Sequence, residues 1–263
     1  MKIRETATII SQEKLSDKVY SMWIETSAAN AALPGQFISV YPNDQAKLLP
    51  RPISICEIDN KHKSGRLRIV YRVAGEGTKG FSLLKATDRI DILGPNGNGF
   101  LAPVKEDITE NTRALLVGGG IGIPPMVELA KQLPCDVTTV AGYRSGSDMF
   151  LTGELESAGK LIVATDDGSF GIHGTVTDAI RQKGIAADII FACGPRPMLK
   201  GIKALAEEMK ISAYISMEER MACGIGACLA CVCRSTKTDD HSKVNNKRVC
   251  VDGPVFEASE VQL

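Results

Sequence analysis

The chain has 263 residues, 44% of them hydrophobic, and its 31 basic residues (Lys and Arg) equal its 31 acidic ones (Asp and Glu). This length and composition allow one or two well-packed domains and exclude a disordered chain, while the zero net charge argues against nucleic acid or a membrane surface as partner. No run of 18 apolar residues predicts a transmembrane helix and the N-terminus lacks a signal-peptide core, so we expect a cytoplasmic protein whose eight cysteines stay reduced.

The first hundred residues have the pattern of a β-barrel. Alternating apolar side chains over residues 67–73 are typical of a half-buried strand, and turn signals such as Pro34-Gly35 separate similar segments. Those segments cover residues 19–24, 36–40 and 89–93. One short helix is predicted over residues 81–86.

The string Arg51-Pro52-Ile53-Ser54 is the chemically informative part of this region. An arginine can hold a pyrophosphate through its forked guanidinium, a proline stiffens the strand entry, and a serine can reach a polar ring edge. Taken alone, the string fits an ordinary edge strand with a surface arginine at least as well.

Strand-like and helix-like segments alternate from about residue 113 to residue 216. Strands are predicted at residues 113–117, 137–141, 161–164, 188–192 and 214–216. Apolar residues spaced three and four apart indicate one helix with Met126, Leu129, Ala130 and Leu133, and another with Met198, Ile202, Leu205, Ala206 and Met209. This alternation predicts a parallel sheet with right-handed crossovers, and such sheets bind ligands beyond the carboxyl ends of their strands.

Two segments at predicted strand ends point to a nucleotide. The first is the glycine run of residues 118–122, whose backbone N–H groups and following helix can receive a phosphate. Because Ile123 stands where the motif G-x-G-x-x-G has its last glycine, a tight strand-to-helix turn is the alternative for this run. The second segment, Cys193-Gly194, also ends a strand and opens a helix. Two such ends in one sheet predict a nucleotide crevice.

Four cysteines near the C-terminus have the spacing of a plant-type [2Fe–2S] ferredoxin. Cys223, Cys228 and Cys231 form the pattern C-x4-C-x2-C, and Cys250 follows after 18 further residues. Small residues such as Gly224 let the backbone wrap closely around the inorganic sulfides. The alternatives are a structural zinc site, which usually pairs two C-x2-C motifs, and buried free cysteines.

One further cysteine, Cys233, lies two residues beyond Cys231. We interpret it as a structural cysteine in the core, with displacement of one of the four named ligands as the alternative. The polar residues 234–248 are predicted to form a solvated loop or a hairpin.

Five motifs occur together in one order along the chain. They are Arg51-Pro-Ile-Ser54, Gly75-Glu-Gly-Thr78, Gly94-Pro95 with Gly97-Asn-Gly-Phe100, the glycine run, and Cys193-Gly-Pro195. In this set the chain resembles the ferredoxin–NADP reductase superfamily. The segments 217–233 and 250–256 resemble more closely the electron-transfer subunit of NAD-dependent (class B) dihydroorotate dehydrogenase, and the similarity covers essentially the whole chain.

The resemblance implies a multidomain α+β protein with FAD, a [2Fe–2S] cluster and NAD as cofactors. The implied domains are an FAD-binding antiparallel β-barrel at residues 1–102, an NAD-binding α/β domain with a parallel sheet at 103–211, and a small ferredoxin-like cluster domain at 212–263. The residues implied to contact FAD are Arg51, Pro52, Ile53, Ser54, Val70, Tyr71, Arg72, Gly77 and Thr78. Those implied to face NAD are Gly118, Gly119, Gly120, Gly122, Asp167, Cys193 and Gly194. The implied cluster ligands are Cys223, Cys228, Cys231 and Cys250.

The acidic pair Asp166-Asp167 follows the predicted strand at 161–164, where NADP-preferring relatives tend to place a basic residue. Acidic side chains repel a 2′-phosphate and therefore favour NAD. A solvated acidic turn is the alternative.

The implied partner is an FMN-containing catalytic subunit, in a heterotetramer with two copies of each chain. Electrons from dihydroorotate would pass from that FMN through the cluster and FAD to NAD⁺, in pyrimidine (UMP) biosynthesis. FAD belongs in the middle because a flavin exchanges one or two electrons, whereas NAD takes hydride and the cluster takes single electrons.

No catalytic side chain is expected, because hydride passes directly between NAD and FAD. The three histidines, His62, His173 and His241, are interpreted as non-catalytic. Two other functions remain as alternatives: a reductase subunit that delivers NAD(P)H electrons to ferredoxin, sulfite reductase or hydrogenase partners, and a zinc-stabilised, non-enzymatic interaction module.

Overall fold

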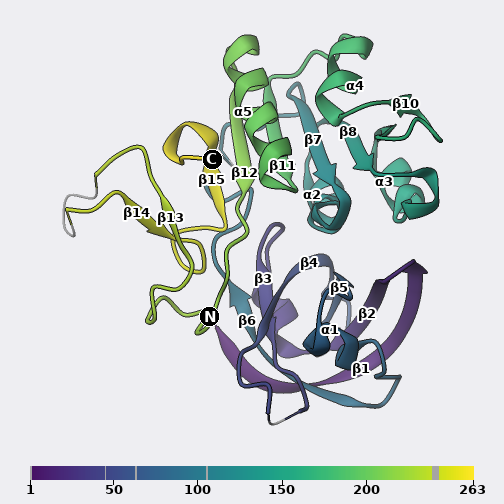
Figure 1. The fold of residues 1–263 in the computed structure, drawn as a ribbon, viewed down its shortest axis with the longest axis vertical. Coiled ribbons are helices and arrows are strands. Elements are labelled where there is room, and N and C mark those ends of the chain that lie inside the picture. Colours follow the sequence, from purple (N-terminus) through teal and green to yellow (C-terminus); the bar gives the residue numbers. More distant parts are fainter. Residues whose placement is uncertain (1, 45, 63, 105, 239–242) are drawn as a thin grey trace.

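The computed structural model describes residues 2–44, 46–62, 64–104, 106–238 and 243–263. It contains a barrel, then a wound α/β unit, then a small C-terminal lobe (Figure 1). The predicted combination of an antiparallel barrel with a parallel-sheet unit is therefore confirmed.

The N-terminal barrel is closed by six antiparallel strands in the order β1-β2-β5-β4-β3-β6. The strands are β1 (Ile3–Ser16), β2 (Val19–Glu25), β3 (Phe37–Val40), β4 (Arg51–Asp59), β5 (Arg66–Arg72) and β6 (Arg89–Asn96), and the 3-10 helix η1 (Ser27–Ala31) follows β2. Side chains that point inward, among them Met22, Ile38 and Ile69, are fully buried. Because successive strand residues face opposite sides, the alternation in the sequence fixes which face forms the core.

The helix predicted over residues 81–86 is wrong: helix α1 spans Glu76–Phe81, and the chain continues without a helix through turns at residues 82–83 and 86–87. The Thr78 hydroxyl accepts hydrogen bonds from the N–H groups of Ala74 (2.9 Å) and Gly75 (3.3 Å), which fixes the start of the helix early. At its end, the Gln12 side chain donates to the carbonyls of Phe81 and Leu84. These carbonyls therefore do not need a continuing helix to be satisfied.

The α/β unit has a seven-stranded sheet in the order β10-β9-β8-β7-β11-β12-β15. Its strands are β7 (Arg113–Gly119), β8 (Asp136–Tyr143), β9 (Lys160–Thr165), β10 (Ile172–His173), β11 (Ile189–Cys193), β12 (Ser212–Ser216) and β15 (Val255–Glu257). All neighbouring strands are parallel except β12 and β15, so the predicted parallel sheet is confirmed with an antiparallel edge.

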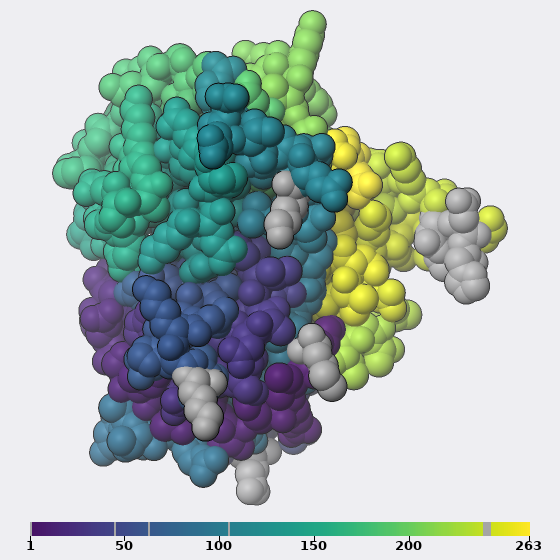
Figure 2. All heavy atoms as spheres, turned by 180° about the vertical axis from the view of Figure 1, so that it is seen from behind, coloured from purple at the N-terminus to yellow at the C-terminus, as the bar shows by residue number. Residues whose placement is uncertain are grey.

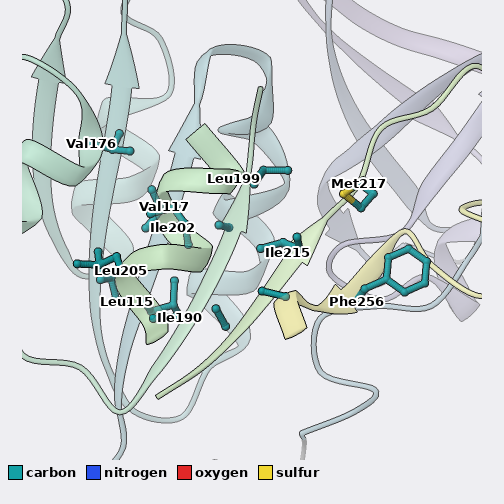
Figure 3. Close-up of a cluster of buried hydrophobic side chains, with 14 of the residues drawn as sticks. Leu115, Val117, Val176, Ile190, Leu199, Ile202, Leu205, Ile215, Met217 and Phe256 are labelled. Carbon is teal, nitrogen blue, oxygen red and sulfur yellow. The ribbon is translucent and has the colours of Figure 1, made fainter. Parts of the chain in front are cut away.

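Helices cover both faces of this sheet. They are α2 (Pro124–Gln132), α3 (Thr152–Ala158), α4 (Val176–Lys183) and α5 (Arg196–Met209), with the 3-10 helices η2 (Gly120–Gly122) and η3 (Gly146–Asp148) between them. Leu115 and Val117 of β7 pack towards α4 and α5 (Figure 3), whereas Leu116 packs towards α2 and α3. The core on the α2 and α3 face of the sheet also contains Val70 and Phe100, so it is continuous with the barrel.

The C-terminal lobe projects from one side of the molecule, beside both the barrel and the sheet (Figure 2). Strands β13 (Val232–Arg234) and β14 (Asn246–Arg248) pair antiparallel, which confirms a hairpin for the polar stretch; residues 239–242, including His241, lie outside the described residues. The chain then returns to the sheet through β15, where Phe256 enters the core, and ends after η4 (Ala258–Glu260).

Among the described residues, none of the helices has both the length and the hydropathy needed to cross a bilayer.

Candidate cofactor sites

A cleft of about 1280 Å³ opens between the barrel and the carboxyl ends of the sheet strands. Of the residues predicted to contact FAD, eight line it: Arg51, Pro52, Ile53, Ser54, Val70, Tyr71, Arg72 and Thr78. Of those predicted to face NAD, five line it: Gly119, Gly120, Gly122, Cys193 and Gly194. Gly77, Gly118 and Asp167 lie outside its lining. The fold thus brings two groups of predicted residues to opposite walls of one cleft.

The barrel wall presents cations held by strands and a turn. Arg51, at the start of β4, donates from Nη1 to the Leu49 carbonyl at 2.6 Å. Its guanidinium lies across the first turn of α1 so closely that a Cβ at Gly77 would be 2.8 Å from Arg51 Nε. Gly77 therefore acts from outside the lining, as the space that lets Arg51 lie there. Arg72, at the end of β5, supplies a second cation. Guanidinium groups that line such a cleft suit a pyrophosphate.

Tyr71 reaches this wall only through its backbone. Its hydroxyl donates to Gln12 Oε1 at 2.8 Å, and its ring contacts Tyr20 and Phe81 inside the barrel. Burial raises the pKa of the Tyr71 phenol, which stays neutral. The neighbouring residues of β5, Val70 and Arg72, alternate to the opposite face and point towards the cleft wall.

The opposite wall is made where two parallel strands end side by side. In the sheet register Gly118 lies opposite Cys193. Beyond that pair, a Cβ at Gly122 would lie 2.2 Å from the Cys193 carbonyl oxygen, and one at Gly119 would lie 2.5 Å from Met198 Sδ. Only glycine allows the two loops to approach this closely. The result is a surface of backbone without side chains, which a dinucleotide can approach closely.

The side chain of Cys193 is half-buried at this wall, near Ser216. Burial raises its pKa to about 12, against a smaller, opposite effect of the Ser216 side chain. Cys193 therefore stays a neutral thiol, which suits packing against a ring and not nucleophilic attack.

The two aspartates after β9 differ in where they point. Asp166 lines the cleft, whereas Asp167 Oδ1 accepts from Ser169 Oγ at 2.5 Å and from the Ser169 N–H at 2.9 Å. These bonds to Ser169 lower the pKa of Asp167, which is fully exposed. Asp166 therefore lines the cleft, whereas the predicted NAD residue Asp167 is hydrogen-bonded within its own turn.

Several cleft residues were not anticipated. They include Phe37, Leu49, Pro50, Ala74, Gly142, Tyr143, Arg144, Asp148, Phe150, the segment Gly174–Thr177, Gly201, the segment Ser216–Met221, and Pro254. The rule that ligands bind beyond parallel-strand ends could have found those that follow β8 and β12. Nothing in their spacing indicates the others.

The four predicted cluster cysteines form two pairs. Cys223 Sγ accepts hydrogen bonds from the N–H of Cys228 and from the N–H of Ile225, both at 3.4 Å. Cys231 Sγ accepts from the N–H of Cys250 at 3.4 Å. Among the described residues, no three cysteine, histidine or carboxylate side chains converge on one metal ion. Two pairs of thiols fit two irons, each with two cysteines, better than one four-coordinate zinc.

The loop between Cys223 and Cys231 is shaped by glycines. Gly224 and Gly226 have φ values of +67° and +87°, and a Cβ on them would lie 2.8 Å from Ser39 Oγ and 2.6 Å from Val251 respectively. The loop can therefore lie against the barrel on one side and the Cys250 segment on the other, which closes a cradle.

The electrostatics favour thiolate at Cys223, whereas burial and the neighbouring Cys231 raise the pKa of Cys250 to about 12. Burial alone raises the pKa of Cys223, but N–H groups of Ile225, Cys228 and Ala227 outweigh burial and lower that pKa to about 6. The same N–H groups are placed to donate to cluster sulfurs. Cys233 belongs to neither pair: it is buried on β13, in the core shared with α5.

The comparisons with known proteins agree over the whole length. A family model described as the iron-sulfur cluster binding domain of dihydroorotate dehydrogenase B matches residues 218–262. Among curated proteins, the dihydroorotate dehydrogenase B (NAD(+)) electron transfer subunit of Geobacillus thermodenitrificans is 44% identical over 99% of both chains. The subunit of the same name from Listeria monocytogenes serotype 4a is 45% identical over 97% of both.

The solved structures show the same class. An NADH-dependent reduced ferredoxin-NADP oxidoreductase, studied for flavin-based electron bifurcation, has a TM-score of 0.84 and 31% identity over 97% of this chain and 89% of its own. A ferredoxin NADP⁺ reductase from Neisseria gonorrhoeae has a TM-score of 0.65 at 16% identity, over 78% of this chain and 91% of its own, and shows the fold alone. Fold and sites define an oxidoreductase of the ferredoxin–NADP reductase type with an added iron–sulfur lobe. Within that class, the chain belongs to the family of dihydroorotate dehydrogenase B (NAD(+)) electron transfer subunits.

Proposed function

We propose that this chain carries electrons between a dihydroorotate-oxidising, FMN-containing catalytic subunit and NAD⁺, through a [2Fe–2S] cluster and FAD. One observation carries the proposal: a single segment serves both sites. Residues Ser216–Met221 line the dinucleotide cleft, and the first cluster cysteine, Cys223, follows two residues later. When bound, NAD exchanges hydride, FAD exchanges one or two electrons, and the cluster exchanges single electrons.

The residues of this chain bind and orient these groups. We propose that Arg51 and Arg72 hold the pyrophosphate of FAD, that Ser54 and Thr78 reach its polar edges, and that Pro52, Ile53, Val70, the Tyr71 backbone and the turn at Gly77 shape the wall. Gly118, Gly119, Gly120, Gly122, Cys193 and Gly194 would accept the NAD backbone and ring. Cys223 and Cys228 would hold one iron, and Cys231 and Cys250 the other.

No side chain is proposed to move a proton during hydride transfer. Of the described histidines, His62 lies 3.3 Å from Asp59 at the surface and His173 is exposed on β10, and neither lines the cleft. The work of the site is to bring the nicotinamide and the flavin together. Thiolate ligands and a reduced cluster call for a reducing compartment, so we place the protein in the cytoplasm.

The test is purification under anaerobic conditions, alone and with the catalytic subunit. The isolated chain should contain FAD and about two irons with sulfide, and it should oxidise NADH with an artificial acceptor. Zinc without flavin would instead support the interaction module.

We further propose that the complex contains two copies of each subunit. Light scattering of the co-purified complex measures its mass and therefore tests this stoichiometry.

Dihydroorotate-driven reduction of NAD⁺ by that complex separates this function from a reductase that serves ferredoxin, the activity named for the electron-bifurcating relative. A chain that recovers no FMN protein, or a complex inert towards dihydroorotate, contradicts the proposal.

The choice of NAD over NADP is expected to depend on Asp166. Asp166→Ser should raise kcat/KM for NADPH about tenfold, because it removes a carboxylate that repels the 2′-phosphate in the cleft. The matched control is Asp167→Ser, whose carboxylate is bonded to Ser169. Steady-state kinetics with both nucleotides measure the effect. Equal changes in the two variants would show that Asp166 has no special role.

A further inference from the structure

An ion cluster around a buried arginine joins the barrel to the α/β unit, at a place that the cofactor chemistry does not use. At its centre, the Arg68 guanidinium on β5 donates to Ser21 Oγ (2.8 Å), Glu57 Oε2 (2.6 Å) and Glu154 Oε1 (2.8 Å), with Glu13 Oε1 at 3.4 Å. The side chain of Arg68 is only 8% exposed. Glu154 lies on α3, so this one side chain ties strands β1, β2, β4 and β5 to a helix of the other unit.

Helix α2 adds a second connection at the same place. Lys131 pairs with Glu57, the carboxylate that Arg68 also holds. One turn earlier, Glu128 Oε2 accepts from the N–H of Ile58 at 2.8 Å, and its other oxygen accepts from Gln132 at 2.7 Å. Both helices on this face of the sheet are thus fastened to the same end of the barrel.

The strand and helix that meet here also reach the cleft. Strand β4 carries Arg51 at its start and Glu57 six residues later, a span of ~20 Å. Helix α2 begins two residues after Gly122 and carries Lys131 seven residues beyond its start, a span of ~10 Å. Strand β4 and helix α2 are both rigid elements with cofactor-binding residues near one end and residues of the ion cluster near the other. A small rotation at the cluster therefore becomes a displacement between the two cleft walls.

Stability is a poor explanation for this cluster. A buried ion pair is often no more stabilising than apolar residues of the same volume, because both charges lose hydration. Burial lowers the pKa of Arg68, but its hydrogen bonds to Glu57 and Glu154 outweigh burial, so the residue stays charged. A guanidinium group has donors at fixed angles, so it fixes the relative position of the groups that it joins, which apolar packing does less strictly.

We propose that Arg68 is a positioning residue, which sets the orientation of the α/β unit on the barrel and thereby the distance from nicotinamide to flavin. This inference rests on the proposed binding of NAD and FAD to the two cleft walls. Glu154 is the partner through which Arg68 reaches the α/β unit, because its other partners lie in the barrel itself.

The test is Glu154→Ala in the complete chain, with Glu156→Ala as control on the same helix, where the side chain is exposed. Stopped-flow mixing with saturating NADH should show flavin reduction about tenfold slower in Glu154→Ala, since misplacement by a fraction of an ångström weakens hydride transfer. The long-wavelength absorbance of nicotinamide stacked on flavin should fall as well. FAD content and the cluster spectrum should stay as in the unmodified chain, and Glu156→Ala should match it throughout.

Arg68→Lys, which keeps the charge and loses the forked guanidinium, should also slow flavin reduction.

Wild-type rate and absorbance in Glu154→Ala overturn the proposal. A rate that falls only in proportion to lost FAD overturns it too, because the residue would then be structural. An unmodified chain that binds no FAD or does not react with NADH would instead refute the proposed function itself.

Discussion

Cys250→Ser is expected to abolish the [2Fe–2S] cluster while the flavin stays bound. Cys250 is the partner of Cys231 in one thiol pair, and it comes from a segment 19 residues away in the chain. Without it, one iron would keep only one cysteine from this chain, because the other pair, Cys223 and Cys228, is proposed to hold the second iron. Iron analysis and the visible spectrum of anaerobically purified protein measure the loss. Cys223→Ser, Cys228→Ser and Cys231→Ser should behave alike.

The matched control is Cys233→Ser, another buried cysteine of the same lobe. It should keep its iron and its spectrum, because Cys233 shares the core with Cys231 and Cys250 but takes part in neither of the two pairs. The assignment would fail if Cys250→Ser retained the cluster, and a cluster lost only in Cys233→Ser would move the fourth ligand to β13.

Arg51→Met is expected to weaken FAD binding about 100-fold, or about 2.8 kcal/mol. The change keeps an unbranched stem of similar length to the aliphatic part of arginine, but it removes the charge and the donors that lie across α1 beside Gly77. Each charge-assisted hydrogen bond to a phosphate contributes about 1.5–3 kcal/mol. Titration of the deflavinated protein with FAD, followed by flavin fluorescence, measures the affinity.

Arg89→Met is the control for this change, because Arg89 is an exposed arginine of the same barrel, on β6. Its FAD affinity should equal that of the unmodified chain. If Arg51→Met binds FAD with normal affinity, Arg51 is the surface arginine of an ordinary strand, and the pyrophosphate must be held elsewhere, with Arg72 as the next cation of that wall.

Local patterns in the sequence predicted those strands and helices whose apolar residues recur with a single regular spacing. The apolar spacing of α2 and α5 and the alternation of β5 reflect burial of one face, which the sequence records directly. The sequence pattern does not predict strand β1, because the register of β1 with β2 shifts after Ile9 and after Lys14 and the period of two is broken. Strand β15 is three residues long and is defined only by its pairing with β12.

The sequence by itself determined the class of cofactor chemistry: cysteine spacing, the glycine run and the Arg51 string are local signals, because neighbours in the chain form each turn. Only the tertiary structure decided which of these parts meet. Gly122 touches the Cys193 carbonyl, Asp166 and not Asp167 lines the cleft, and Arg68 meets Glu154 across 86 positions of sequence. Such contacts depend on how the sheet packs on the barrel, and packing between distant segments leaves no periodic trace in either segment.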